Sequence, residues 1–322
     1  MLYPLTFQPI FKERIWGGRN LESLYQKKLP PHIPIGESWE ISDRPSDESI
    51  IAHGPFIGKS LRWLMDNHRA SLLGSVQPSA SGRFPLLIKI LDAQQKLSLQ
   101  VHPPAAQALR LGGEPKTEMW YVAHATSEAD LFAGLKPGTT RAEFERRIKD
   151  ATVEKCFHRI AVKKGDALFL PSGRVHAIGA GNVIFEIQQN SDTTYRVFDW
   201  NRRDAHGQPR ELHIEKSLES IDFNDIEPSL VFQKKIAPDA QQVLANDPLF
   251  SVTLCQIASA SNLLLADRSM QILGVIEGKL TIHHLEKEIT LGAGQFSLIP
   301  ASLEKVRLTA KTTALFLCIQ AG

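Results

Sequence analysis

Residues 165–176 read GDALFLPSGRVH: a glycine, a short apolar run, a Pro-x-Gly turn and, three residues later, a histidine. Residues 294–305 read GQFSLIPASLEK and repeat this spacing, with Gly294 in the place of Gly165 and Lys305 in the place of His176. An apolar run bounded by glycine and proline is typical of a β-strand followed by a turn. The chain therefore contains two copies of one β unit, and only the first keeps the histidine.

Short runs rich in branched and aromatic residues recur between the glycines and prolines of the whole chain. The clearest strand candidates are residues 85–91, 96–102, 119–124, 167–171 and 182–189. Helix signals are few, at residues 60–67, 104–111 and 140–150, and the last of these opens with a capping box from Thr140 to Glu143. Many short strands with few helices predict a mainly β fold of the jelly-roll kind. A polar stretch from residue 204 to about 241 separates the two copies, so we place the domain boundary between residues 234 and 235.

The composition excludes several classes of protein. The 322 residues suffice for two domains of about 150 residues each, and 43% are hydrophobic. With 37 basic and 35 acidic residues the net charge is +2, and no basic run marks a nucleic-acid partner. The sequence does not open with a signal-peptide pattern, and its longest uncharged stretch, residues 248–266, is interrupted by polar residues. Three widely spaced cysteines form no disulfide framework. We expect a cytoplasmic protein that does not associate with membranes.

Four polar side chains are spaced so that they can converge on a divalent metal ion. Gln100 and His102 lie two apart on a predicted strand and therefore point to the same face. Lys116 and Glu118 are also two apart, just before another strand, and His176 follows the Pro-x-Gly turn. An amide, two imidazoles and a carboxylate suit zinc, with positions left open for water or substrate. The alternative is that these are scattered polar residues on a sheet face.

The motif from Gly165 to His176 resembles the second motif of the cupin family. The surrounding segments resemble type I phosphomannose isomerases in their short form: IWGGRNL (15–21), IGESWEIS (35–42), the stretch 84–103 that ends in LSLQVHP, PKTEMWYV (115–122), and the stretch 169–202. The resemblance covers most of residues 1–205. It implies two cupin barrels with a few short helices and no large helical insertion domain. In this interpretation residues 1–234 form the catalytic, metal-binding domain, and residues 235–322 form a degenerate cupin domain without a metal site.

The resemblance also transfers the family's site onto this sequence, residue by residue. It implies one zinc ion per chain, with the ligands Gln100, His102, Glu118 and His176. The implied catalytic residues are Lys116, Asp192, Arg196 and, with a one-residue difference in loop length, Glu186. The implied substrate-binding residues are Ser98, Lys116 and Arg202, the last with Arg203 as its alternative. Trp16 is a further candidate for the wall of the sugar pocket, although a core tryptophan is an equally good interpretation.

The function implied by this resemblance is zinc-dependent interconversion of mannose 6-phosphate and fructose 6-phosphate through an enediol or enediolate. A zinc ion polarises the substrate oxygens, and an arginine such as Arg196 stabilises the charge that develops as a proton leaves carbon. A basic group must move that proton. Asp192, Glu186 and a metal-bound water all remain open as the base.

Other functions are possible from the residues alone. A non-catalytic sugar-binding cupin with a regulatory role need not keep Lys116, Asp192 and Arg196 beside an intact ligand set. Cupin oxygenases usually place three histidines and one glutamate around a redox metal, whereas Gln100 occupies the first position here. Isomerisation of a different sugar phosphate remains open, as does the choice between monomer and homodimer. We interpret Glu37, Trp39 and Glu40 as structural residues of an edge strand.

Overall fold

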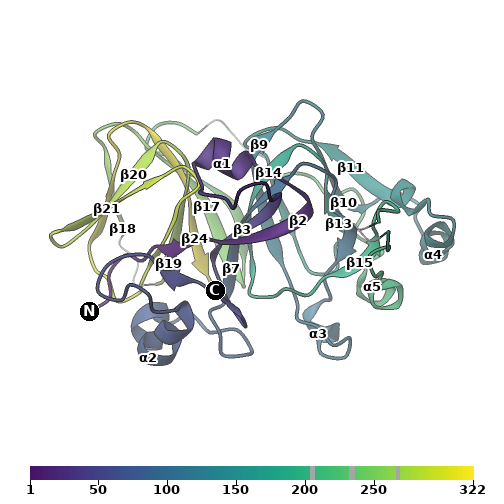
Figure 1. The fold of residues 1–322 in the computed structure, drawn as a ribbon, viewed down its shortest axis with the longest axis horizontal. Helices are drawn as coiled ribbons and strands as arrows, with labels where there is room; N and C mark the ends of the chain where they lie inside the picture. The colour runs from purple at the N-terminus through teal and green to yellow at the C-terminus, as the bar shows by residue number, and fades with distance from the viewer. Residues whose placement is uncertain (204–206, 232–235, 266–268) are drawn as a thin grey trace.

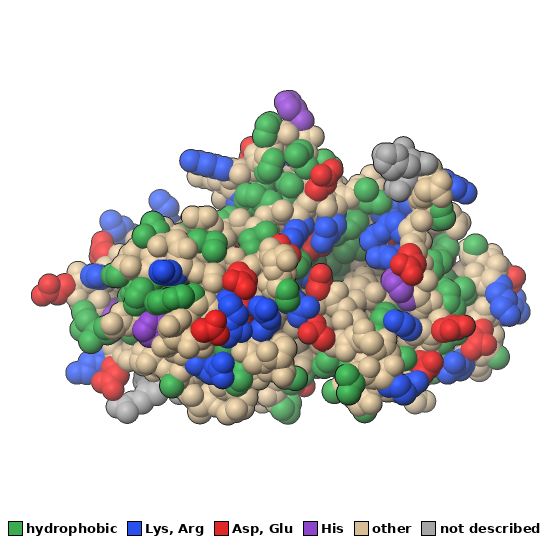
Figure 2. Space-filling view, turned by 60° about the horizontal axis from the view of Figure 1, so that its bottom comes forward, with side chains coloured by type: hydrophobic (Ala, Val, Ile, Leu, Met, Phe, Trp, Pro, Cys, Tyr) green, Lys and Arg blue, Asp and Glu red, His purple; other side chains and the backbone are tan. Residues whose placement is uncertain are grey.

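Two β-barrels lie side by side in the computed structural model, which describes residues 1–203, 207–231, 236–265 and 269–322. The purple-to-teal strands of the N-terminal part form one barrel and the green-to-yellow strands of the C-terminal part form the other (Figure 1). Basic and acidic side chains are interspersed on the face shown in Figure 2, which is hollowed near its middle. None of the described helices has the length and apolar character needed to cross a membrane.

The first barrel consists of two antiparallel sheets. In spatial order, the six-stranded sheet contains β12 (Ala167–Leu170), β9 (Glu118–Ala125), β14 (Asn182–Gln189), β7 (Leu86–Ala93), β3 (Ile35–Ile41) and β2 (Ile10–Gly18). The five-stranded sheet contains β11 (Phe157–Ala161), β10 (Asp130–Leu135), β13 (His176–Ile178), β8 (Leu99–Val101) and β15 (Tyr195–Phe198).

The second barrel also consists of two antiparallel sheets, each with one strand fewer than its counterpart in the first barrel. One contains β16 (Gln241–Asp247), β17 (Phe250–Ile257), β24 (Ala314–Ala321), β19 (Gln271–Glu277) and β22 (Phe296–Ile299). The other contains β18 (Asn262–Leu265), β23 (Val306–Thr309), β20 (Lys279–His284) and β21 (Lys287–Gly292).

The remaining elements are small. Two short ladders pair β1 (Phe7–Gln8) with β6 (Ile50–Ile51) and β4 (Asp43–Arg44) with β5 (Asp47–Glu48). The described helices are α1 (Asn20–Tyr25), α2 (Leu61–Leu73), α3 (Ala105–Ala108), α4 (Arg141–Lys149), α5 (Ile214–Ser220) and the 3-10 helix η1 (Val153–Cys156). The longest, α2, has 13 residues, so the mainly β fold is confirmed.

The central strands of the six-stranded sheet, β3, β7 and β14, are buried on both faces, and the alternation of side chains along them decides which residues face the barrel interior. Along β14, Phe185 and Ile187 point away from the interior into the core shared with the second barrel, whereas Ile184 points inward. The ring of Phe185 lies 5.3 Å from that of Phe296. Because side chains on a strand alternate between faces, Glu186 points inward like Ile184.

The internal repeat is visible in the backbone. The N–H of Gly165 donates to the carbonyl of Val122 at 2.8 Å, and the N–H of Gly294 donates to that of Val275 at the same distance. Both glycines have positive φ, 95° and 74°, which explains why a glycine opens each copy. The predicted domain boundary falls among residues 232–235, which lie outside the described part of the chain.

Most predicted elements are confirmed, with changes in length. The strand at 182–189 matches β14, and Thr140 caps α4 by accepting a hydrogen bond from the N–H of Glu143 at 3.2 Å. The strand predicted over residues 96–102 is confined to Leu99–Val101, and the helix predicted over 104–111 to Ala105–Ala108. The interpretation of residues 37–40 as an edge strand is wrong, because β3 pairs with both β2 and β7.

Candidate active site

The two sheets of the first barrel bring the predicted metal ligands together. His176 begins β13 and is paired in register with Gln100 on β8, while Glu118 begins β9 in the opposite sheet. His102 directly follows β8, where its carbonyl accepts a hydrogen bond from the N–H of Gly173 at 2.9 Å. This contact anchors the Pro-x-Gly turn beside the ligand strand. The ligand atoms of His102, Glu118 and His176 all lie within 4.8 Å of one another, and all three residues are buried.

Both imidazoles present an unprotonated nitrogen to the same point. His102 Nδ1 lies 2.8 Å from the carbonyl oxygen of Thr193, and His176 Nδ1 lies 2.9 Å from that of Arg174. A carbonyl can only accept a hydrogen bond, so Nδ1 carries the proton in both rings and Nε2 carries a lone pair. Backbone carbonyls that orient imidazoles in this way are typical partners of metal-binding histidines.

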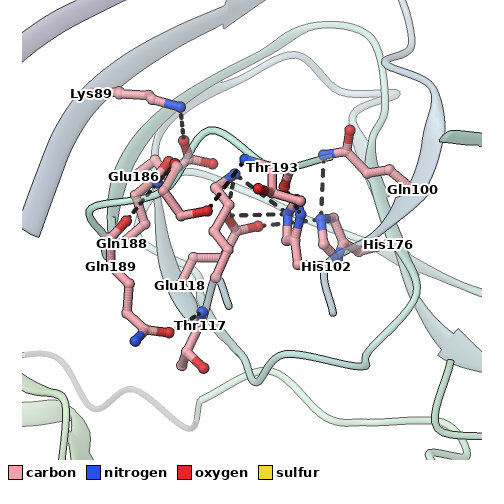
Figure 3. A network of polar contacts seen from close by, with 12 residues as sticks. Lys89, Gln100, His102, Thr117, Glu118, His176, Glu186, Gln188, Gln189 and Thr193 are labelled. Carbon is pink, nitrogen blue, oxygen red and sulfur yellow. Dashed lines mark hydrogen bonds and ion pairs between the residues drawn. The ribbon is translucent and has the colours of Figure 1, made fainter. Parts of the chain in front are cut away.

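The carboxylate of Glu118 completes this arrangement. Its Oε1 lies 3.3 Å from His176 Nε2, and no described residue donates a hydrogen bond to that oxygen. Two lone pairs that face each other in a buried site repel unless a cation lies between them. The donor set therefore fits a metal ion. The Gln100 amide is adjacent, with Nε2 at 3.3 Å from His176 Nε2, and rotation of this amide presents its oxygen instead (Figure 3).

The electrostatics also favour metal binding. Burial, followed by the charge of Lys116, lowers the pKa of His102 and His176, the latter to about 3, so both rings are neutral near pH 7. Burial raises the pKa of Glu118 to about 7, although the ammonium of Lys116 opposes this rise. A divalent cation would stabilise the ionised carboxylate that burial disfavours.

Lys116 lies at the edge of the ligand group. Its Nζ is 2.9 Å from Glu118 Oε2 and 3.4 Å from His102 Nε2. Burial alone would lower the pKa of Lys116, but the carboxylates of Glu118 and Glu186 outweigh it and raise the pKa. The lysine is therefore held as a buried cation beside the centre.

Glu186 is a second buried carboxylate, and its environment is the opposite of that of Glu118. Trp120 Nε1 donates to its Oε1 at 3.0 Å, and Lys89 Nζ lies 3.2 Å from its Oε2. Burial raises the pKa of Glu186, but the charges of Lys116 and Lys89 outweigh burial and lower it to about 2. The site thus contains two carboxylates whose proton affinities are driven apart, an arrangement often found where protons are transferred.

A group of arginines surrounds one acid beyond the ligand strand. Arg196 on β15 is paired in register with Gln100. Arg202 forms an ion pair with Asp199, and Arg210 Nη1 lies 3.6 Å from the other carboxylate oxygen of Asp199. Burial lowers the pKa of Arg196, and the charge of Arg210 lowers it further. Arg202 and Arg210 thus lie beside Asp199, and the charges of all three act on the pKa of Arg196, so positive charge is in excess here.

The other predicted residues lie at different depths. Ser98 is buried just before β8, and Trp16 is buried in the core cluster of the barrel interior that also contains Trp120. Asp192 is exposed, although its charge contributes to the raised pKa of Lys116. Arg203 is exposed and donates to the carbonyl of Gly207 at 2.8 Å, so Arg202 is the better placed of the two arginines.

Sequence reasoning missed four residues of this region and interpreted a fifth, Glu37, only as a structural strand residue, although the signal for two of them was present. Lys89 is a lone lysine inside an apolar strand, at a position whose alternation directs it inward. The same alternation along β9 directs Trp120 inward with Glu118. The other three are Glu37, Asp199 and Arg210: Glu37 meets Arg14 and Lys89 through strand pairing, and Asp199 meets Arg210 through loop packing.

Two jelly-roll barrels, one of which encloses a His–Glu–His group with converging lone pairs, define a cupin with a candidate metal centre. Comparison with known proteins specifies the family. Residues 5–114 match the model of the phosphomannose isomerase type I catalytic domain, and residues 241–318 match the model of the mannose-6-phosphate isomerase cupin domain.

Individual relatives agree with these matches. The chain is 37% identical over 308 residues to mannose-6-phosphate isomerase ManA of Bacillus subtilis, which covers 95% of both chains. It is 38% identical over 261 residues to the mannose-6-phosphate isomerase of Streptococcus mutans, 81% of each chain. The crystal structure of a Bacillus subtilis mannose 6-phosphate isomerase superposes with a TM-score of 0.88 at 30% identity and covers 99% of this chain and 100% of that one. The chain belongs to the type I phosphomannose isomerase family, which is a family of enzymes.

Proposed function

We propose that the chain is a zinc-dependent aldose–ketose isomerase that interconverts mannose 6-phosphate and fructose 6-phosphate through an enediol or enediolate. The family indicates the reaction. The observation that carries the proposal is the convergence of His102 Nε2, His176 Nε2 and Glu118 Oε1 on one buried point with no described hydrogen-bond donor to that oxygen. A site that only stabilised the fold would provide a hydrogen-bond donor to that buried carboxylate oxygen.

We propose that His102, Glu118, His176 and the amide oxygen of Gln100 hold one zinc ion per chain. Neutral imidazoles and a carboxylate are ligands that zinc prefers. When bound, the ion supplies Lewis-acid polarisation of substrate oxygens, which facilitates loss of the neighbouring carbon-bound proton.

Glu186 is the better supported candidate for the group that moves the proton between the two carbons. It is buried and ionised, whereas Asp192 is exposed to solvent. An ionised carboxylate can accept a proton from one carbon and return it to the next; the lowered pKa makes Glu186 a weaker base, so its support as the proton-moving group is its buried position beside Lys116. Lys116, held as a cation, is placed to stabilise negative charge on the substrate oxygens.

The arginines provide positive charge for the two anionic parts of the substrate. Arg196, next to Gln100 in the sheet, faces the charge that develops in the enediolate. Arg202 and Arg210 are assigned to the phosphate dianion, for which guanidinium groups are suited. Ser98 and Trp16 are assigned to sugar contacts. Residues 235–322 are assigned to a second domain without a metal site, which supports the first by packing against it.

A coupled assay over a panel of hexose and pentose phosphates tests this function directly. We expect turnover of mannose 6-phosphate that is lost after chelation and restored by zinc. Binding of the sugar phosphate without turnover would indicate a non-catalytic sugar-binding cupin. Turnover of only another sugar phosphate would contradict the substrate assignment but leave the reaction class intact. Bound iron with oxygen uptake would indicate an oxygenase.

A further inference from the structure

Lys89 is a buried lysine to which the proposed reaction assigns no role. It lies in the middle of β7 with its side chain 5% exposed. Its ammonium lies 3.2 Å from Glu186 Oε2, 4.0 Å from Glu37 Oε2 and 5.1 Å from the centre of the Trp39 ring. A buried ammonium is costly unless it is paired. An apolar residue would fill this strand position at lower cost, so the charge itself needs an explanation.

Lys89 is itself held in place from the opposite side. Glu37 accepts a hydrogen bond from Trp39 Nε1 at 2.7 Å and another from Arg14 Nε at 2.7 Å. Burial raises the pKa of Glu37, but the charges of Lys89 and Arg14 outweigh burial and lower it. Glu37 is thus a fixed anion on β3. Lys89 lies between this anion, to which the proposed reaction assigns no role, and the carboxylate of Glu186.

The carboxylate of Glu186 is held at both oxygens, by two different strands. Lys89 on β7 pairs with Oε2 (Figure 3), and Trp120 on β9 donates to Oε1. Register places Glu186 directly opposite both residues, Lys89 on one side and Trp120 on the other. With only one of these contacts, the carboxylate is free to rotate about its last bond.

We propose that Lys89 is a positioning residue that fixes the Glu186 carboxylate in the direction needed for proton transfer; this inference rests on the proposed function. Lys116 is the other cation whose charge acts on this carboxylate. Without Lys89, Glu186 turns toward Lys116, and the proton-moving group pairs with the cation that serves the substrate oxygens. Misplacement of a catalytic group by about 1 Å is enough to lower a rate about 10²-fold.

A double-mutant cycle between Lys89 and Glu186 tests this proposal. We expect Lys89→Met to lower kcat about 10²-fold with KM changed by less than about threefold. The kcat of Lys89→Arg should be at least about tenfold higher than that of Lys89→Met. Glu186→Gln should lower kcat about 10²–10⁴-fold. In the Glu186→Gln background, Lys89→Met should cost less than about threefold, because the carboxylate that it positions is already absent. Metal content should be unchanged in every variant.

Lys27 provides a matched control. Its side chain is only 8% exposed and forms an ion pair 2.8 Å from Glu40, but it faces the second barrel, where it donates to the carbonyl of Gly294 at 3.1 Å. Lys27→Met should lower the unfolding temperature while kcat stays within about threefold of the wild type. If Lys89→Met does not fold, Lys89→Gln keeps a hydrogen-bond donor without the charge, and we expect the same dependence on Glu186 with about a tenfold loss of kcat.

Equal fold-losses from the Lys89 substitution in the wild-type and Glu186→Gln backgrounds would overturn the proposal and make Lys89 a structural residue. Loss of bound metal in Lys89→Met would also overturn it, because the effect would then pass through the metal centre. Absence of turnover of every sugar phosphate in the panel by the zinc-loaded wild type refutes the proposed function and this role together. Turnover in the wild type with additive losses refutes only the role of Lys89.

Discussion

Removal of one ligand, by His176→Ala, is the most direct test of the metal centre. Four-ligand zinc sites bind their ion with about 10–16 kcal/mol near neutral pH, or roughly 3–4 kcal/mol per ligand. Loss of that amount weakens metal binding by about 10²–10³-fold. His176 Nε2 is one corner of the ligand group, 3.3 Å from Glu118 Oε1. Its removal leaves one imidazole ligand, His102, and one carboxylate ligand, Glu118. The neutral amide oxygen of Gln100 remains as a third, weaker ligand.

The effect can be measured as stabilisation of the fold by zinc. At a free zinc concentration of about 100 times the wild-type Kd, binding stabilises the wild-type protein by about 2.7 kcal/mol. The same concentration is at or below the Kd of the variant, so its stabilisation is at most about 0.4 kcal/mol. Urea unfolding with and without zinc measures both values, and metal analysis after dialysis gives the stoichiometry.

His283→Ala is the matched control, because His283 lies in the second barrel, where its Nε2 lies 2.8 Å from Thr309 Oγ1. This variant should retain one zinc ion and the full stabilisation. If His176→Ala also retains both, the ligand assignment is wrong. If zinc stabilises neither the wild type nor the variants, the buried lone pairs belong to a site for a different cation or to no metal site.

Three further predictions concern other parts of the molecule. Arg196→Ala should lower kcat about 10²–10³-fold with little change in KM or zinc content, and Arg196→Lys should restore only part of the loss; a raised KM at constant kcat would make this arginine a phosphate anchor. Lys305→Ala, at an exposed position, should change activity little and stability by less than about 0.5 kcal/mol, and a second bound metal in that barrel would contradict its assignment. Because the pKa of Glu37 lies below its ordinary 4.5 in the folded protein, its ionised form stabilises the fold above pH 4.5, and this contribution is lost as the pH falls through the folded-state pKa. The unfolding free energies of Glu37→Gln and wild type should therefore converge below pH 4.5, whereas exposed Glu13→Gln should follow the wild type throughout.

Local pattern predicts the part of the fold that brings His102, Glu118 and His176 together. Because side chains on a strand alternate between faces, the spacing of Gln100 and His102 places both on one side of β8. The Pro-x-Gly turn places His176 at the start of β13. Both signals depend on a few consecutive residues. The structure adds the pairing of His176 with Gln100, which no local pattern specifies.

Residues whose roles depend on long-range pairing were not predictable in the same way. Glu37 was interpreted as an edge residue because nothing near it in sequence shows that β3 lies between β2 and β7. The contact between Lys89 and Glu186 joins residues 97 positions apart, and Asp199 and Arg210 meet through loop packing. A lone charge in an apolar strand indicates a buried partner, but only the sheet order identifies it.

The second barrel covers the outer face of the sheet that holds Glu118, Glu186 and Lys89, and this packing role does not require a metal ion. On β9, β14 and β7 these charged residues alternate with Met119, Phe185 and Ile90, which point into the core shared with the second barrel. An uncovered outer face would expose those apolar side chains to water, and the strands would lose the packing that fixes their register. A one-residue slip would turn every charged group away from the site. We therefore expect the second copy to tolerate Lys305 in the place of the histidine, because the contacts it makes with the first barrel are apolar, as where Phe296 on β22 meets Phe185.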